Sequence, residues 1–310
     1  MISADRARGA LVGVVVGDAL GAPFEGRPGP VAPRALSAVF DGTTELPYTD
    51  DTATTFDLAE SLLERGGLDL DHLAATLART YERQPHRGYG AGAAHLLRQV
   101  AEGAGWRPAA AAQFGGQGSF GNGAAMRVAP IALLARGDVE KAARLGRASA
   151  TVTHTHPEGA DAAGVQAGAV ALALASSGPM DRHRFVDRVL DVTETEQLRD
   201  ALSAVADLEP DTSPGDVGRC TGTGVAAVEA VPAAIAAVTL HPDSFSDAVR
   251  FAVRLGGDTD TIASMAGAIA GARLGQVAIP GSWLDRAEGV ARAAELADRL
   301  LRVGGAAPPA

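Results

Sequence analysis

Two acidic, hydroxyl-bearing clusters that lie far apart in the sequence constrain the fold most strongly. One is Asp258-Thr259-Asp260-Thr261, which follows a Gly-Gly pair and precedes a helical run of Ala, Met, Ile and Gly; the other is Thr49-Asp50-Asp51-Thr52. Each opens a predicted helix, where a single Asp or Thr often caps the first turn. Capping needs one such residue, whereas adjacent carboxylates repel unless a cation or hydrogen-bond donors offset their charge. Because Mg2+ prefers oxygen ligands, the residues support capping and one shared metal site equally well.

Apolar residues in the rest of the chain recur mainly at helical spacing. Few segments alternate with the period of a strand, and no fixed repeat is present. Hydrophobic residues make up 46% of the chain but aromatic residues only 4%, so Ala, Val and Leu must fill the core, which suits closely packed helices. We therefore expect one compact all-α domain over residues 1–303, with a disordered tail at 304–310 and a surface loop at 27–48. Helices are predicted at 6–20, 52–64, 68–83, 93–100, 126–134, 160–175, 222–240, 245–255, 261–274 and 284–303.

The charge balance argues against one class of partner. The formal net charge is −10, whereas nucleic-acid-binding surfaces normally show a basic patch. The single Cys220 rules out an intramolecular disulfide and is unremarkable in a reducing cytosol. No targeting segment is evident, and Glu229 and Pro232 interrupt the apolar run 222–240, which favours a buried helix over a membrane span. These features predict a cytoplasmic protein with no membrane segment and no basic nucleic-acid surface.

A glycine-rich stretch from Gly115 to Arg127 has the composition of an anion-binding loop. Its glycines would let backbone amides approach an anion ahead of the next helix, and Ser119 and Asn122 add polar side chains. The stretch is not a P-loop, because it lacks the Gly-Lys-Ser/Thr ending, and no clear strand precedes it as in a dinucleotide-binding βαβ unit. Phe114 and Phe120 stand out in a chain poor in aromatics; either could belong to the core or stack on an adenine or ribose.

Two further loops carry candidate side chains. Glu25 lies in a Gly- and Pro-containing loop after the first predicted helix, where catalytic groups are often presented, although most exposed loop glutamates have no such role. His154 and His156 lie between predicted helices. Because a zinc site usually needs a third N or S donor, hydrogen bonding by His154 to ligand oxygens is the better functional interpretation, and a loop histidine with local partners is the alternative.

In combination, these stretches resemble the ADP-ribosylglycohydrolase family, which includes the dinitrogenase reductase-activating glycohydrolase and the ADP-ribosyl-serine hydrolases. The matching motifs span most of the chain and follow the family's order. Two acidic motifs separated by a Gly-Asn-Gly loop form a highly specific combination. The motifs are Gly17-Asp18-Ala19-Leu20-Gly21 through Glu25, Tyr48-Thr49-Asp50-Asp51-Thr52, Gly118-Ser119-Phe120-Gly121-Asn122-Gly123-Ala124-Ala125-Met126-Arg127, Thr153-His154-Thr155-His156-Pro157, and Gly256-Gly257-Asp258-Thr259-Asp260-Thr261.

The resemblance implies an all-α orthogonal helical fold with a binuclear centre of two Mg2+ ions, or Mn2+ in some members. By motif match, one ion would be held by Thr49, Asp50 and Asp51. The other would be held by Asp258 and Thr261, with Asp260 as the bridge. Glu25 matches the family's loop glutamate near the metals, which serves as general acid or base or as a gating ligand.

The resemblance also implies a site for the ligand ADP-ribose. The residues that would line its diphosphate and distal ribose are Gly118, Ser119, Phe120, Gly121 and Asn122. His154 would contact the same ligand, and Phe114 would stack near the adenine. The carboxylates that would serve catalysis are Glu25, Asp50, Asp51, Asp258 and Asp260.

The resemblance implies a monomeric, metal-dependent hydrolase that acts on ADP-ribosylated protein. The sequence of the stretch 118–127 is more similar to the branch of the family that acts on O-linked, serine-type substrates than to the arginine branch. Those substrates include polymeric and O-acetyl forms. An ADP-ribosyl-arginine hydrolase and a family member that binds ADP-ribose without turnover are the alternatives. A Mg2+-dependent prenyl-transfer or terpene-type synthase is a rival of another class, but its Asp-rich motifs have other spacings and its cavity is lined with aromatics, of which this chain has few.

Overall fold

The structure, a computed structural model, describes residues 2–303, which form one body of α-helices with no β-strand among them. This confirms the predicted all-α class, whereas the tail predicted at 304–310 lies outside the described residues. The longer helices are α1 (Ala4–Gly21), α2 (Pro33–Phe40), α3 (Asp50–Arg65), α4 (Leu70–Arg83), α5 (Ala91–Ala101), α6 (Trp106–Gly116), α7 (Ala129–Ala135), α8 (Val139–Ala150), α9 (Pro157–Ala175), α10 (Arg182–Leu190), α11 (Glu196–Ala206), α12 (Pro214–Thr221), α13 (Ala227–Leu240), α14 (Phe245–Arg254), α15 (Thr259–Leu274) and α17 (Val290–Val303). Four short helices complete the set: η1 (Ala22–Phe24), η2 (Asn122–Ala124), η3 (Gln276–Ala278) and α16 (Gly281–Leu284).

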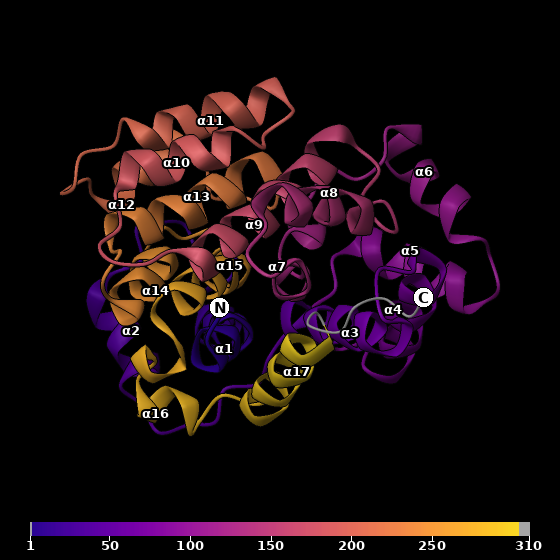
Figure 1. Ribbon diagram of the computed structural model, residues 1–310, viewed down its shortest axis with the longest axis horizontal. Coiled ribbons are helices and arrows are strands. Elements are labelled where there is room, and N and C mark those ends of the chain that lie inside the picture. Colours follow the sequence, from indigo (N-terminus) through magenta and orange to yellow (C-terminus); the bar gives the residue numbers. More distant parts are fainter. Residues whose placement is uncertain (1, 304–310) are drawn as a thin grey trace.

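The antiparallel pair α1 and α15 forms the centre of the molecule, with the other helices around it (Figure 1). Glycines spaced four residues apart lie on one face of α1 and let the two backbones touch. A Cβ atom at Gly13 would lie 2.1 Å from the carbonyl oxygen of Gly267, and one at Gly17 would lie 2.1 Å from that of Ala263. Because the helices run in opposite directions, the C-terminal end of α1 meets the N-terminal end of α15, which begins next to Asp258.

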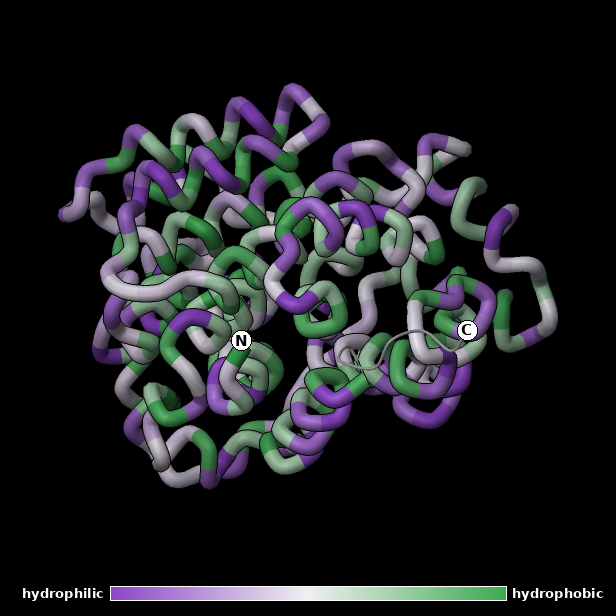
Figure 2. The backbone as a smooth tube through the Cα atoms, in the orientation of Figure 1, coloured by the Kyte–Doolittle hydropathy of each residue, from purple (hydrophilic) through white to green (hydrophobic). Residues whose placement is uncertain are grey.

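Helix α1 and the turn after it, Ala4–Phe24, are long and apolar enough to cross a membrane by length and composition, but 83% of the most apolar window is buried inside the fold. Its central residues, such as Val14 and Val15, are fully buried. The helix therefore belongs to the core. In Figure 2, by contrast, the outlying α10 and α11 alternate between hydrophilic and hydrophobic residues, as burial on one side requires.

Four predictions about local structure were wrong. The helix predicted from 284 begins only at Val290, because the separate short helix α16 ends at Leu284. Residues 27–48 are not only loop, because α2 forms there and buries Leu36 and Phe40. The helix predicted from 222 begins at Ala227, since Gly222 has a φ of 75° and starts a short loop. The helix predicted from 126 begins only at Ala129. The buried character of α13, including Pro232, is confirmed.

Candidate functional site

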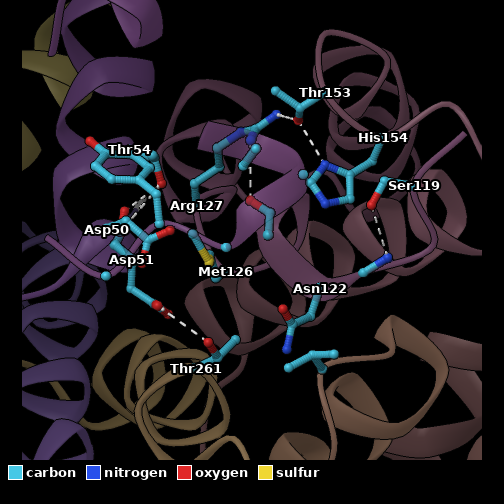
Figure 3. A pocket seen from close by; sticks show the side chains of 18 of the residues that line it. Asp50, Asp51, Thr54, Ser119, Asn122, Met126, Arg127, Thr153, His154 and Thr261 are labelled. Atoms are coloured by element: carbon cyan, nitrogen blue, oxygen red, sulfur yellow. Dashed lines mark hydrogen bonds between the residues drawn. The ribbon is translucent and has the colours of Figure 1, made fainter. Parts of the chain in front are cut away.

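The two acidic clusters face one pocket of about 430 Å3. Figure 3 shows Asp50, Asp51 and Thr261 on one side of it and Asn122 and His154 on the other. The acidic side comes from the N-terminal ends of α3 and α15 and the turn after α1, and the opposite side from the glycine-rich loop and the segment that follows α8. Elements far apart in the sequence thus close one site.

Three carboxylates converge on the acidic side. Glu25, Asp258 and Asp260 each place an oxygen so that all three atoms lie within 4.8 Å of one another. Burial, and next the charge of Asp258, raise the pKa of Asp260 to about 9 and also raise that of Glu25. Carboxylates packed this closely need a positive charge to be ionised together. The donor set therefore fits a hard divalent cation.

Backbone hydrogen bonds fix Glu25 in this position. The amide of Gly26 donates to the carbonyl of Gly257 at 2.8 Å, and the amide of Gly257 donates to the carbonyl of Arg27 at 2.8 Å. Gly257 has a φ of 72°, and a Cβ there would lie 2.0 Å from the carbonyl oxygen of Thr223. The glycine is required for the turn that places the Glu25 loop beside Asp258.

Asp258 does not behave as a simple helix cap. It occupies the N-cap position of α15, yet its side chain bonds no amide of that helix. Its Oδ2 instead accepts a hydrogen bond from Nδ2 of Asn122 at 2.6 Å. This geometry excludes capping as the explanation of the Asp258 side chain.

The second cluster is joined directly to the first. Asp51, only 1% exposed, accepts hydrogen bonds from the hydroxyl of Thr261 at 3.2 Å and from that of Ser264 at 2.5 Å. Burial, and next the charge of Asp18, raise the pKa of Asp51 well above its usual value and that of Asp50 to about 7. Ser264 was assigned no role from the sequence, although it lies one turn after Thr261 on the same helix face.

Thr49 begins α3 at the edge of this cluster. Its hydroxyl donates to Asp18 at 2.8 Å and accepts a long hydrogen bond of 3.4 Å from the amide of Asp51. Capping is therefore part of its function in the fold, as the sequence allowed. Thr49 does not line the pocket surface, although Asp50 and Asp51 do.

The aromatic pair of the glycine-rich stretch lies at the surface. Phe114 is 55% exposed and Phe120 is 37% exposed, and their ring centroids are 5.2 Å apart. Phe114 also has a φ of 51°, a conformation that costs a bulky residue energy and often marks functional positions. Of the two interpretations left open by the sequence, the structure excludes a core role. Phe114 lines the pocket, whereas Phe120 and Gly118 do not.

His154 is held by a buried chain of hydrogen bonds (Figure 3). Nη2 of Arg127 donates to the hydroxyl oxygen of Thr153 at 2.8 Å, and that oxygen lies 2.7 Å from Nδ1 of His154. The threonine proton is then free to be donated to Nδ1, which places the imidazole proton on Nε2. Burial, and next the charge of Arg127, lower the pKa of His154 to about 3. A neutral Nε2–H donor therefore faces the pocket near Gly121 and Gly123.

His156 has a different function from His154. Its Nδ1 accepts a hydrogen bond from the amide of Glu158 at 3.3 Å, so it caps α9. The interpretation of a loop histidine with local partners therefore holds for His156.

The loop between α12 and α13, which falls inside the helix predicted at 222–240, organises both sides of the pocket. Its Thr223 carbonyl accepts the amide of Asp258 at 2.8 Å, and its Val225 carbonyl accepts the amide of Asn122 at 3.0 Å. Gly224 is held in turn by Glu229, whose Oε2 accepts its amide at 2.7 Å. No local pattern in the sequence distinguishes these carbonyl contacts from an ordinary loop.

Comparisons with known proteins agree over nearly the whole chain. A family model described as ADP-ribosylglycohydrolase matches residues 2–309. The chain is 40% identical to ADP-ribosylhydrolase ARH3 of Danio rerio, covering 95% of this chain and 90% of that protein, and 34% identical to ADP-ribosylhydrolase ARH3 of Homo sapiens, covering 97% and 94%. A solved structure described as "ADP-ribosylglycohydrolase-related protein complex" matches with a TM-score of 0.75 at 30% identity, covering 97% of this chain and 98% of that one.

Proposed function

This chain belongs to the ADP-ribosylglycohydrolase family, and from that premise we propose that it releases ADP-ribose from O-linked, serine-type substrates in a reaction that depends on divalent cations. The observation that carries the proposal is the convergence of Glu25, Asp258 and Asp260 in one pocket. The similarity to proteins named ADP-ribosylhydrolase supports the hydrolase part.

Two cations, Mg2+ or Mn2+, are proposed for the acidic side of the pocket. Support comes from the hard oxygen donors and from the raised pKa values of Asp50 and Asp260, since a bound cation would favour their ionised forms. When bound, such ions would orient the ribose hydroxyls and polarise the reacting centre. The proposed ligands are Thr49, Asp50 and Asp51 for one ion, Asp258 and Thr261 for the other, and Asp260 between them.

Glu25 is the proposed general acid or base. Its carboxyl group is exposed at the edge of the pocket, beside Asp258 and Asp260. Partial burial, and next the charge of Asp258, raise its pKa, which is the direction that favours a carboxyl group as a proton donor. Positive charge develops at the anomeric carbon in glycoside cleavage, so Asp50, Asp51, Asp258 and Asp260 would also stabilise the transition state.

We propose that uncharged hydrogen-bond donors bind the diphosphate, because a protein with a net charge of −10 must offset its repulsion of an anionic ligand. The residues that would supply these donors, His154 through Nε2–H, Ser119 through its hydroxyl and Gly121 through its backbone, line the same pocket as the carboxylates. Contacts from Gly118, Phe120 and Asn122 belong to the same proposal. Phe114 stands at the pocket edge, exposed enough to stack on the adenine.

The assignment to O-linked substrates depends on the stretch 118–127, whose sequence is more similar to the serine branch of the family than to the arginine branch. ADP-ribosyl-arginine hydrolysis and binding of ADP-ribose without turnover are the alternatives. We place the protein in the cytoplasm as a monomer acting on ADP-ribosylated protein, and size-exclusion chromatography with light scattering tests the monomer.

The decisive experiment uses two matched peptides, one ADP-ribosylated on serine and one on arginine, each with Mg2+ and with chelator. We expect Mg2+-dependent release of ADP-ribose from the serine peptide alone. Release from the arginine peptide alone would contradict the assignment to the serine branch but not the assignment of hydrolase activity. Release from neither, with ADP-ribose still bound in calorimetry, would instead support a binding protein.

A further inference from the structure

A buried carboxylate outside the pocket organises the start of α3. Asp18 lies in α1, is fully buried, and does not line the pocket. Both of its oxygens accept the amide of Thr49, at 3.1 and 3.0 Å, and Oδ2 also accepts the amide of Thr52 at 3.1 Å. The hydroxyls of the same two residues donate to it as well, Thr49 at 2.8 Å and Thr52 at 2.6 Å.

These contacts show what Asp18 cannot do. An ionised carboxylate has about four lone-pair sites, and the two amides and two hydroxyls of Thr49 and Thr52 already use them. Asp18 is therefore not itself a cation ligand. The position of Asp18 is also fixed by helix packing, because the backbone of α1 contacts that of α15 at the adjacent Gly17.

The same contacts decide which way the Thr49 hydroxyl points its proton. The nearest competing acceptor for that proton is Oδ2 of Asp51, at 3.5 Å compared with 2.8 Å for Asp18. A hydroxyl has one proton and two lone pairs. With the proton donated to Asp18 and one lone pair accepting the amide of Asp51, the Thr49 oxygen has one lone pair left to offer to a cation.

We propose that Asp18 is a positioning residue for the cation site. It accepts the hydrogen bond that the Thr49 hydroxyl donates and holds the first turn of α3, so that a lone pair of the Thr49 oxygen faces a cation. The inference rests on the cation site of the proposed function. It adds to that site a partner, supplied by α1, that acts only through Thr49. Substitution of a residue that hydrogen-bonds to a metal ligand typically lowers metal affinity by about 10–100-fold.

The test measures Mg2+ and Mn2+ binding by calorimetry on chelator-treated protein, so it does not depend on turnover. Asp18→Asn places an amide where four donors need an acceptor, and we expect about 10–100-fold weaker binding per folded molecule. The matched control is Thr52→Val, which removes a hydroxyl bonded to the same carboxylate but leaves the Thr49 contact. Its cation affinity should stay close to that of the wild type.

A double-mutant cycle separates positioning from other effects. If Asp18 acts through Thr49, then Asp18→Asn should weaken binding little further in a Thr49→Val background. An equal loss in both backgrounds, or unchanged affinity in a folded but less stable Asp18→Asn protein, would overturn the inference and leave Asp18 a purely structural cap.

If Asp18→Asn does not fold, the wild-type protein still provides a test. Addition of Mg2+ should shift the 13Cγ resonance of Asp18 in step with the amide of Thr49, because the shared hydroxyl is polarised by the ion; an unmoved Asp18 resonance would contradict the proposal. Asp18-dependent cation binding without ADP-ribose release would refute the proposed function and leave this inference intact.

Discussion

Thr261 and Asp51 are separated by 210 positions in the sequence, yet the threonine hydroxyl donates to the buried carboxylate at 3.2 Å. Ser264, one turn further along α15, donates to the other oxygen of Asp51. The contact couples the first turns of α3 and α15, the two helices that bring carboxylates to the pocket. A substitution in the first turn of either helix should therefore displace the first turn of the other.

Cation binding should stabilise the folded protein. Without a cation, the clustered carboxylates are held together against their mutual repulsion, so Mg2+ should raise the melting temperature of chelator-treated protein in a concentration-dependent way. At a free Mg2+ concentration of about 100 times Kd, the gain is about 2.7 kcal/mol. Differential scanning fluorimetry checks this. Asp260→Asn should melt higher than the wild type in chelator and gain much less from Mg2+; a wild-type response in that variant would argue against Asp260 as a ligand.

Glu25→Gln should separate binding from turnover. The amide keeps the shape and the Gly26–Gly257 backbone contacts of the loop, but it cannot exchange a proton. We expect ADP-ribose affinity within a few fold of the wild type and turnover reduced about 10^2–10^4-fold. Single-turnover release from the serine peptide and calorimetry with ADP-ribose measure the two quantities. A variant with wild-type turnover would remove Glu25 from the mechanism.

Gly13→Ala should destabilise the core. The added Cβ would lie 2.1 Å from the carbonyl oxygen of Gly267, which is backbone and cannot move without separating α1 from α15. We expect the free energy of unfolding to fall by about 1–3 kcal/mol or more, measured by urea titration with chelator present. Gly67→Ala is the matched control, because a Cβ there meets no atom within 4 Å. Equal effects of the two substitutions would contradict the close packing of α1 on α15.

Asp57 should make stability depend on pH. Its side chain is buried on α3, where Oδ1 accepts the hydroxyl of Thr80 at 2.6 Å, and burial raises its pKa to about 7 from 3.8. Because the unfolded chain loses the proton first, stability at this site is full below about pH 4 and is lost as the pH rises toward 7. The loss is of the order of 4 kcal/mol for a shift of this size.

Asp57→Asn tests whether protonated Asp57 stabilises the fold and whether that stability is lost as the pH rises. The variant should be more stable than the wild type at pH 8, and the difference should shrink as the pH falls toward 4, in urea titrations with chelator present. Asp200→Asn on α11, an exposed position, should show no such trend. A difference that is the same at all pH values would mean that Asp57 is ionised in the folded protein.

The amino-acid sequence alone determined the all-α class, the two acidic clusters and the glycine-rich stretch, because helical periodicity, capping and turn chemistry are read over a few neighbouring residues. It also carried the motifs of the family, which the comparisons confirmed. These local patterns could not establish which buried polar groups meet. Asp258 and Thr49, for example, both read as caps, but only Thr49 accepts a helix amide.

Tertiary structure decided the rest. The close antiparallel packing of α1 on α15 brings Glu25 to Asp258, and the contact of α1 with the start of α3 brings Asp18 to Thr49. The loop after α12 supplies carbonyls to both sides of the pocket. Such contacts depend on the distance between helix backbones, which small residues set across long stretches of chain. The exposure of Phe114 and the burial of Asp18 are likewise set by tertiary structure, and neither can be inferred from the neighbours of those residues in the sequence.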